Sequence, residues 1–157
     1  MSDWFAVVDA ARHPNLHGLV SHCREQRPLF AEPVDKALVQ HSPYLAALRE
    51  DEPLLATWRQ HGIGQSWGVL VEATADFASL QRHLRQFLRV KLPDGSIVLF
   101  RFYDPRVLRV FLPSAPPEQL AQFFEGILQF VVDAEDGGQH SFRFRQGHLF
   151  DGDRALN

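Results

Sequence analysis

The sequence predicts an α/β domain in which helices pack on a mixed sheet that includes β-hairpins, with α+β as the alternative if the early strands pair antiparallel. Three observations lead to this class. The chain has 157 residues, 45% of them hydrophobic, which suits one core and is too short for two comfortable domains. Short apolar runs alternate with helical segments in the first half, and two glycine-containing turns separate β-prone runs in the second half. We therefore expect a single domain over residues 1–150 and a frayed polar tail over residues 151–157.

The first third of the chain predicts a strand, a helix and a long irregular stretch. Residues 4–11 form an apolar run, WFAVVDAA, that is typical of a buried strand. A helix is expected over about residues 15–26. Its inner face would hold Leu16, Leu19, Val20 and Cys23. Residues 28–45 contain three prolines, so we expect irregular chain there with a brief strand near Leu38 and Val39.

The middle of the chain predicts a helix, a strand and a second helix. Residues 51–53, Asp-Glu-Pro, are typical of a helix start with proline in the first turn, and the glycines in residues 62–64 end that helix. Residues 67–73 are expected to form a strand, after which Thr74 or Asp76 could cap the next helix. One face of that helix is apolar and consists of Phe77, Leu80, Leu84, Phe87 and Leu88.

The last third predicts two hairpins with two helices between them. A Pro-Asp-Gly turn at residues 93–95 separates two β-prone runs, which together indicate a hairpin over residues 90–102. One helix is expected from Pro105 to near Pro113, and another over residues 116–128. Residues 130–132 and 141–145 flank the Gly-Gly turn at residues 137–138 and predict the second hairpin.

Composition excludes several classes of function. The formal net charge of −3 and a pI near 6.2 argue against nucleic acid as a partner, because domains that neutralise phosphates are usually basic. Fourteen of the sixteen basic residues are arginine, which favours protein interfaces. One cysteine, no signal peptide and no long apolar run predict a cytoplasmic protein without a membrane partner.

Motifs for a metal or a cofactor are weak. His13 and His17 are four residues apart, with His22 and Cys23 further on, but a proline after His13 places it at or before the helix start. The glycines of residues 62–68 leave a helix and enter a strand, which is the reverse of a phosphate-binding loop. We therefore expect no metal and no cofactor.

The most informative local feature is the segment Arg101-Phe102-Tyr103-Asp104. If residues 97–103 form a strand, alternation places Arg101 and Tyr103 on one face with Leu99. A buried guanidinium needs a carboxylate partner, and Asp9 or Asp104 could supply it. Two interpretations stay open, an acid-binding or catalytic pocket and a structural Arg–Asp pair that holds the sheet together, and the structural pair is favoured.

Five arginines could form one basic patch if the helix of residues 76–89 lies beside the helix that follows Pro105. These residues are Arg82, Arg85, Arg89, Arg106 and Arg109. An acidic protein surface is the functional partner that such a patch predicts, and a solvated helix face is the simpler alternative.

Several segments together resemble one known family. They are FAVVDAA at 5–11, SPYL at 42–45, SWGVLV at 66–71, LRQFLRVKLPDG at 84–95 and RFYDPRVL at 101–108. This pattern is similar to the type VI secretion adaptor/chaperone family, from about residue 4 to residue 130. The positions that match are Asp9, Pro43, Tyr44, Trp67, Gly68, Asp94, Gly95, Arg101, Tyr103, Asp104 and Pro105.

The resemblance implies a non-enzymatic adaptor that binds a cognate toxin effector and helps load it onto the VgrG spike, in some cases through a PAAR-type region. It implies no catalytic residues. The candidates for structural or partner-binding roles are Asp9, Tyr44, Trp67, Arg101, Tyr103, Asp104 and the five arginines. Two alternatives stay open. One is a small enzyme or ligand-binding domain centred on Arg101, Tyr103 and Asp104, and the other is an immunity protein, which the acidic pI fits but the resemblance does not.

Overall fold

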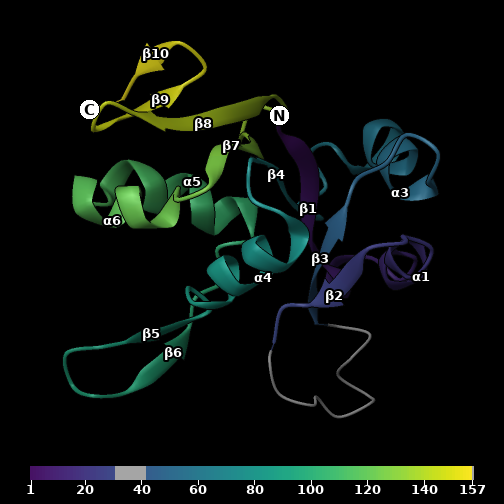
Figure 1. Ribbon diagram of the computed structural model, residues 1–157, viewed down its shortest axis with the longest axis horizontal. Coiled ribbons are helices and arrows are strands. Elements are labelled where there is room, and N and C mark those ends of the chain that lie inside the picture. The colour runs from purple at the N-terminus through teal and green to yellow at the C-terminus, as the bar shows by residue number, and fades with distance from the viewer. Residues whose placement is uncertain (31–41, 157) are drawn as a thin grey trace.

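An eight-stranded sheet organises the computed structural model, which describes residues 1–30 and 42–156 (Figure 1). The strand order is β10-β9-β8-β7-β4-β1-β3-β2. Each pairing between the described strands is antiparallel. The α/β class is thus confirmed, and the sheet has the antiparallel form of the α+β alternative.

The described strands and helices have the following bounds. The sheet contains β1 (Asp3–Asp9), β2 (Gln26–Pro28), β3 (Pro43–Ala47), β4 (Gly68–Ala73), β7 (Ile127–Asp133), β8 (Gln139–Arg145), β9 (His148–Asp151) and β10 (Arg154–Ala155), and a separate hairpin contains β5 (Arg89–Lys91) and β6 (Ile97–Leu99). The helical segments are η1 (Ala10–Arg12), α1 (Leu16–Ser21), α3 (Pro53–Thr57), η2 (Trp58–Gly62), α4 (Phe77–Arg85), α5 (Pro105–Ser114) and α6 (Pro117–Phe123).

Helices cover both faces of the sheet around β1. Phe5 and Val7 face a core to which α4, α5 and α6 contribute, whereas Ala6 and Val8 face a smaller core built with α1, α3 and η2. Figure 1 shows α1 and α3 together on one side and α4, α5 and α6 on the other. Because both faces of β1 are covered, its sequence is a continuous apolar run and not an alternating one.

Local turn and cap signals are confirmed. The Asp76 carboxylate caps α4 by accepting a hydrogen bond of 2.8 Å from the backbone N–H of Ser79. Proline occupies the first turn of α3, α5 and α6. The Pro-Asp-Gly and Gly-Gly turns lie at the tips of the β5–β6 and β7–β8 hairpins.

Several predicted elements differ from the structure. The helix expected over residues 76–89 ends at Arg85, so Arg89 lies in β5 and not on a helix. The first helix ends at Ser21, and residues 26–28 pair with β3 as a strand. The part of 28–45 predicted to be irregular includes the start of β3, which is fully buried. The predicted helix over residues 116–128 ends at Phe123, because Gly126 takes a positive φ of 76° and turns the chain into β7. The strand predicted near Leu38 and Val39 lies outside the described residues.

The prediction of a frayed tail from Asp151 is wrong. Asp151 ends β9, and Arg154–Ala155 pair with β9 as β10. The Asp151 carboxylate accepts a hydrogen bond of 2.9 Å from the backbone N–H of Ser141 and lies 2.7 Å from Nδ1 of His140. These side-chain contacts and Leu156, which packs against the main core, hold the end of the described chain on the sheet.

Candidate partner-binding site

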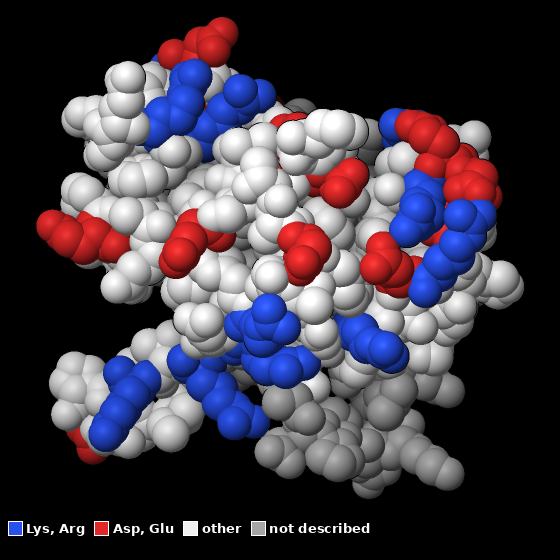
Figure 2. Space-filling model, viewed as in Figure 1, with Lys and Arg blue, Asp and Glu red and all other residues white. Residues whose placement is uncertain are grey.

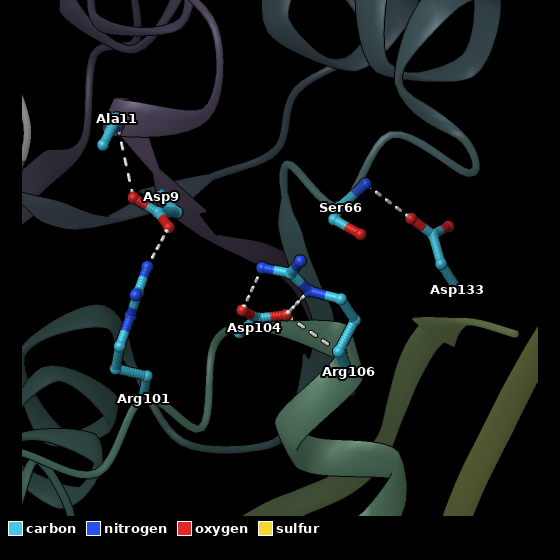
Figure 3. Close-up of polar contacts among 7 residues, drawn as sticks. All are labelled: Asp9, Ala11, Ser66, Arg101, Asp104, Arg106 and Asp133. Carbon is cyan, nitrogen blue, oxygen red and sulfur yellow. Dashed lines mark hydrogen bonds and ion pairs between the residues drawn. The ribbon is translucent and has the colours of Figure 1, made fainter. Parts of the chain in front are cut away.

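Of the two carboxylates predicted as possible partners of Arg101, the structure pairs it with Asp9. Asp9 is the last residue of β1, and its carboxylate is buried. One carboxylate oxygen accepts the backbone N–H of Ala11 at 3.2 Å, and the other accepts Nη2 of Arg101 at 2.9 Å (Figure 3). Asp9 therefore caps η1 and at the same time attaches the segment after the β5–β6 hairpin to the centre of the sheet.

The predicted strand around Arg101 is wrong. Strand β6 ends at Leu99, and the consecutive residues Phe102 and Tyr103 are both buried, which alternation would not allow. The Arg101 side chain is 46% exposed, so its guanidinium is not the buried cation that the strand pattern predicts. Its Cζ atom lies 5.8 Å from the centre of the Tyr103 ring. Burial raises the pKa of Tyr103, so its hydroxyl stays protonated at neutral pH.

Asp104 pairs with Arg106. Its carboxylate caps α5 by accepting the backbone N–H of Arg106 at 2.9 Å (Figure 3). The same carboxylate accepts Nε of Arg106 at 3.0 Å and Nη2 at 2.8 Å. Burial acts to raise the pKa of Asp104, but the hydrogen bonds and the charge of Arg106 outweigh it and lower the pKa. Asp104 is therefore an ionised helix cap.

Tyr44 and Trp67 are buried in the smaller core. The Tyr44 ring lies 5.7 Å from the ring of His17, and Trp67 lies 5.9 Å from Trp58 in an edge-to-face arrangement. His13 is 5.7 Å from Trp67. The histidines at 13 and 17 thus contact aromatic rings, and the described residues contain no group of three side chains suited to a metal ion.

The five arginines separate into two sets by their contacts. Arg106 is bound by Asp104, and Arg109 donates to the backbone oxygen of Asp133 at 3.1 Å. Arg85 donates to the backbone oxygen of Leu29 at 2.8 Å. Arg82 and Arg89 are exposed and form no ion pair with the described part of the chain. The basic surface that is free to meet a partner therefore lies over α4 and β5.

Residues 4–122 match a known family, described as Domain of unknown function (DUF4123). The chain belongs to the DUF4123 family. This family is associated with type VI secretion. No curated protein and no solved structure matches the chain.

The DUF4123 domain also has an exposed surface on the β5–β6 hairpin, and the sequence did not predict this exposure. The β5–β6 hairpin projects away from the eight-stranded sheet (Figure 1). Its strands expose large apolar side chains, with Ile97 66% and Leu99 47% exposed. Figure 2 shows basic side chains gathered over α4 and along this hairpin. The Pro-Asp-Gly turn predicted the hairpin, but only the strand order shows that no other described strand pairs with it.

A second surface of the DUF4123 domain lies on the other side of β1. A hollow of about 460 Å³ is bordered by polar and apolar residues of β1, β4, α3 and η2. Its apolar lining includes Trp4, Leu55, Trp58, Ile63 and Leu70. The hollow and the hairpin share no residue. None of the helices in the described chain is long and apolar enough to cross a bilayer.

Proposed function

We propose that this DUF4123 domain is a cytoplasmic, non-enzymatic adaptor that binds a cognate toxin effector and helps load it onto the VgrG spike. The observation that carries the proposal is membership, over residues 4–122, of a family associated with type VI secretion. An adaptor has to contact two proteins at once. The exposed hairpin and the hollow beside Trp4 are two separate surfaces that could serve these two partners.

The polar contacts at Asp9 and Asp104 support a non-enzymatic role. Both carboxylates are bound by backbone N–H groups and by arginine side chains within the chain. A general base or a nucleophile must instead be available to a substrate atom at hydrogen-bonding distance. The residues that suggested a catalytic pocket thus have a structural use that accounts for their burial and pairing.

Co-purification tests the proposal. The tagged protein is co-expressed with the products of its flanking genes and then analysed by size-exclusion chromatography. We expect a stable complex that contains a toxin and a spike protein. A lone protein that elutes without any of these co-expressed neighbours would argue against the adaptor role.

The Asp104→Asn variant separates the adaptor from the enzyme alternative. Asparagine can still cap α5, so we expect the variant to fold and to retain both partners. A folded variant that loses turnover on a substrate hydrolysed by the wild type would favour an enzyme centred on Arg101, Tyr103 and Asp104.

A further inference from the structure

The β5–β6 hairpin has one face with two chemically distinct rows. Arg89 pairs across the hairpin with Leu99, and Lys91 pairs with Ile97. Directly paired residues in antiparallel strands lie on the same face. Two cations therefore follow β5, and two large aliphatic side chains follow β6 beside them. We call these four residues the hairpin face.

Neither row of the hairpin face is used by the rest of the described chain. Ile97 and Leu99 are among the most exposed large apolar residues of the molecule. Arg89 and Lys91 form no ion pair with a described residue. An exposed apolar row rimmed by unpaired cations is characteristic of an interaction surface.

Among the described residues, the backbone groups of the hairpin face also have no partner outside the hairpin. The bonds from Leu92 N to Ser96 O at 2.8 Å and from Phe100 N to Leu88 O at 2.7 Å fix which pairs are hydrogen-bonded within the hairpin. By alternation, the backbone N–H and C=O groups of the four face residues point to its two outer edges. Two-stranded hairpins are marginally stable alone, and free edges invite a partner.

From these observations we propose that the hairpin face is the docking surface for an acidic amphipathic segment of the effector. Carboxylates of the segment pair with Arg89 and Lys91, and its apolar side chains cover Ile97 and Leu99. Naming the effector as the owner of this segment rests on the proposed function. The chemistry of the segment follows from the two rows alone.

Two other occupants fit the hairpin face less well. A lipid surface would leave the outward N–H and C=O groups without partners in hydrocarbon, and the turn that would enter first carries the Asp94 carboxylate. A second copy of the same face would bring Arg89 and Lys91 against identical cations. A protein segment with carboxylates avoids both costs.

The test compares two pairs of variants in the full chain. The apolar variant is Ile97→Thr with Leu99→Thr, and its control is Val110→Thr with Leu128→Thr, because Val110 and Leu128 are exposed to 66% and 46%. The charge variant is Arg89→Glu with Lys91→Glu. Its control is Arg145→Glu with Arg154→Glu on β8 and β10, which lie at the top of Figure 1, whereas the hairpin lies at the bottom.

Binding is measured with the co-expressed flanking toxin and with a labelled synthetic peptide in which Glu and Leu alternate. We expect each hairpin variant to weaken both interactions about tenfold, the controls to bind like the wild type, and salt to weaken binding. A peptide of alternating Lys and Leu should not bind. Circular dichroism and the melting temperature establish that all variants fold.

The outcomes separate this inference from the adaptor role. Toxin binding that survives both hairpin variants overturns the docking surface and leaves the adaptor role intact. Peptide binding through the hairpin without any toxin complex supports the surface and contradicts the adaptor role. Absence of both interactions overturns both. Hairpin-dependent binding to phosphatidylserine vesicles, or hairpin-dependent dimerisation, would also overturn the protein-segment assignment.

Discussion

Asp9 connects two segments that are far apart in the sequence, because its carboxylate accepts hydrogen bonds both from the backbone of η1 and from the side chain of Arg101. In this ion pair the Arg101 side chain is exposed and the Asp9 side chain is buried. Solvent screening at the guanidinium limits the strength of the pair. The burial of Asp9 makes the loss of its partner costly, because a buried charge then loses a hydrogen bond.

A double-mutant cycle measures the Asp9–Arg101 pair. We expect Asp9→Asn to lower the free energy of unfolding more than Arg101→Gln, because only Asp9 is buried. The coupling energy between the two should be about 1 kcal/mol, from urea denaturation. A coupling energy near zero would show that the two side chains do not stabilise the fold through each other.

Gly68 is required by a close approach between β1 and β4. A Cβ atom at this position would lie 1.9 Å from the backbone oxygen of Val7. Gly68→Ala should therefore destabilise the protein by about 3 kcal/mol, seen as a lower urea midpoint. Gly18→Ala is the matched control, because nothing lies within 4 Å of a Cβ there and the site is helical. It should be neutral or slightly stabilising, and an equal loss in both variants would contradict the steric argument.

The Cys23 thiol is expected to be unreactive in the native protein. Burial, and then the negative charge of Glu52, raises the pKa of Cys23 from 9.0 to about 11. At pH 8 only about one thiol in a thousand is ionised, and the thiolate is the reactive form. Modification with a disulfide reagent should be slow until the protein is unfolded in guanidinium. Fast stoichiometric labelling at pH 8 without denaturant would contradict this.

Among the helices and strands, the sequence predicts best the features that depend on a few neighbouring residues. The Asp76 cap, the prolines that open α3, α5 and α6, and the two hairpin turns follow from backbone requirements of single positions. Helix lengths were predicted less well. The apolar spacing that continues to Cys23 predicts a first helix up to Gln26, but the helix ends at Ser21 and the chain turns before it enters β2.

The candidate site was predicted in part. The need of Arg101 for a carboxylate followed from its charge within an apolar run, but the sequence left Asp9 and Asp104 open as the partner, and the structure shows that it is Asp9. The assignment of Arg101 to a strand face is wrong because β6 ends at Leu99, so the alternation of side chains between two faces does not extend to Arg101. The hairpin lies outside the main sheet, so its apolar residues are exposed. Whether these apolar side chains are exposed depends on the strand order, and a local sequence pattern does not predict the strand order.

The Asp104 cap of α5 should give the protein an acid-dependent stability. Hydrogen bonds from Arg106 hold the pKa of Asp104 below its ordinary value of 3.8, so the ionised carboxylate stabilises the fold above that value. This contribution is lost as pH falls through the lowered pKa. Asp104→Asn should cost about 1 kcal/mol at pH 7, and the difference from the wild type should shrink below about pH 4.

Thermal unfolding of both proteins between pH 7 and pH 3 checks the Asp104 prediction. Asp76→Asn is the control, because Asp76 caps α4 in the same way but is solvent-exposed and forms no ion pair with described residues. We expect Asp76→Asn to change the melting temperature, and its dependence on pH, less than Asp104→Asn does. A difference between wild type and Asp104→Asn that stays constant with pH would show that the loss is not electrostatic.

The family segment and the folding unit do not coincide. The family match ends at residue 122, inside α6, whereas the sheet continues through β7, β8, β9 and β10. Strand β7 pairs with β4 directly, and Phe130 of β7 stacks on Phe123 of α6 with ring centres 5.0 Å apart. The main core therefore depends on residues that follow the family segment.

We predict that a fragment of residues 1–122 does not fold independently. Removing β7 to β10 leaves the β4 edge unpaired and takes the buried side chains of Phe130, Val132 and Phe142 out of the main core. Burial of each of these large apolar side chains stabilises the fold by about 2 kcal/mol, so the loss of all three is comparable to the whole free energy of unfolding of a marginally stable domain. The fragment should show no cooperative thermal transition by circular dichroism and should expose apolar surface to a dye, whereas residues 1–156 unfold cooperatively. A fragment that melted like the longer chain would mean that β7 to β10 fold onto a core that is already complete, and the sheet would then be two units joined at the β4–β7 boundary.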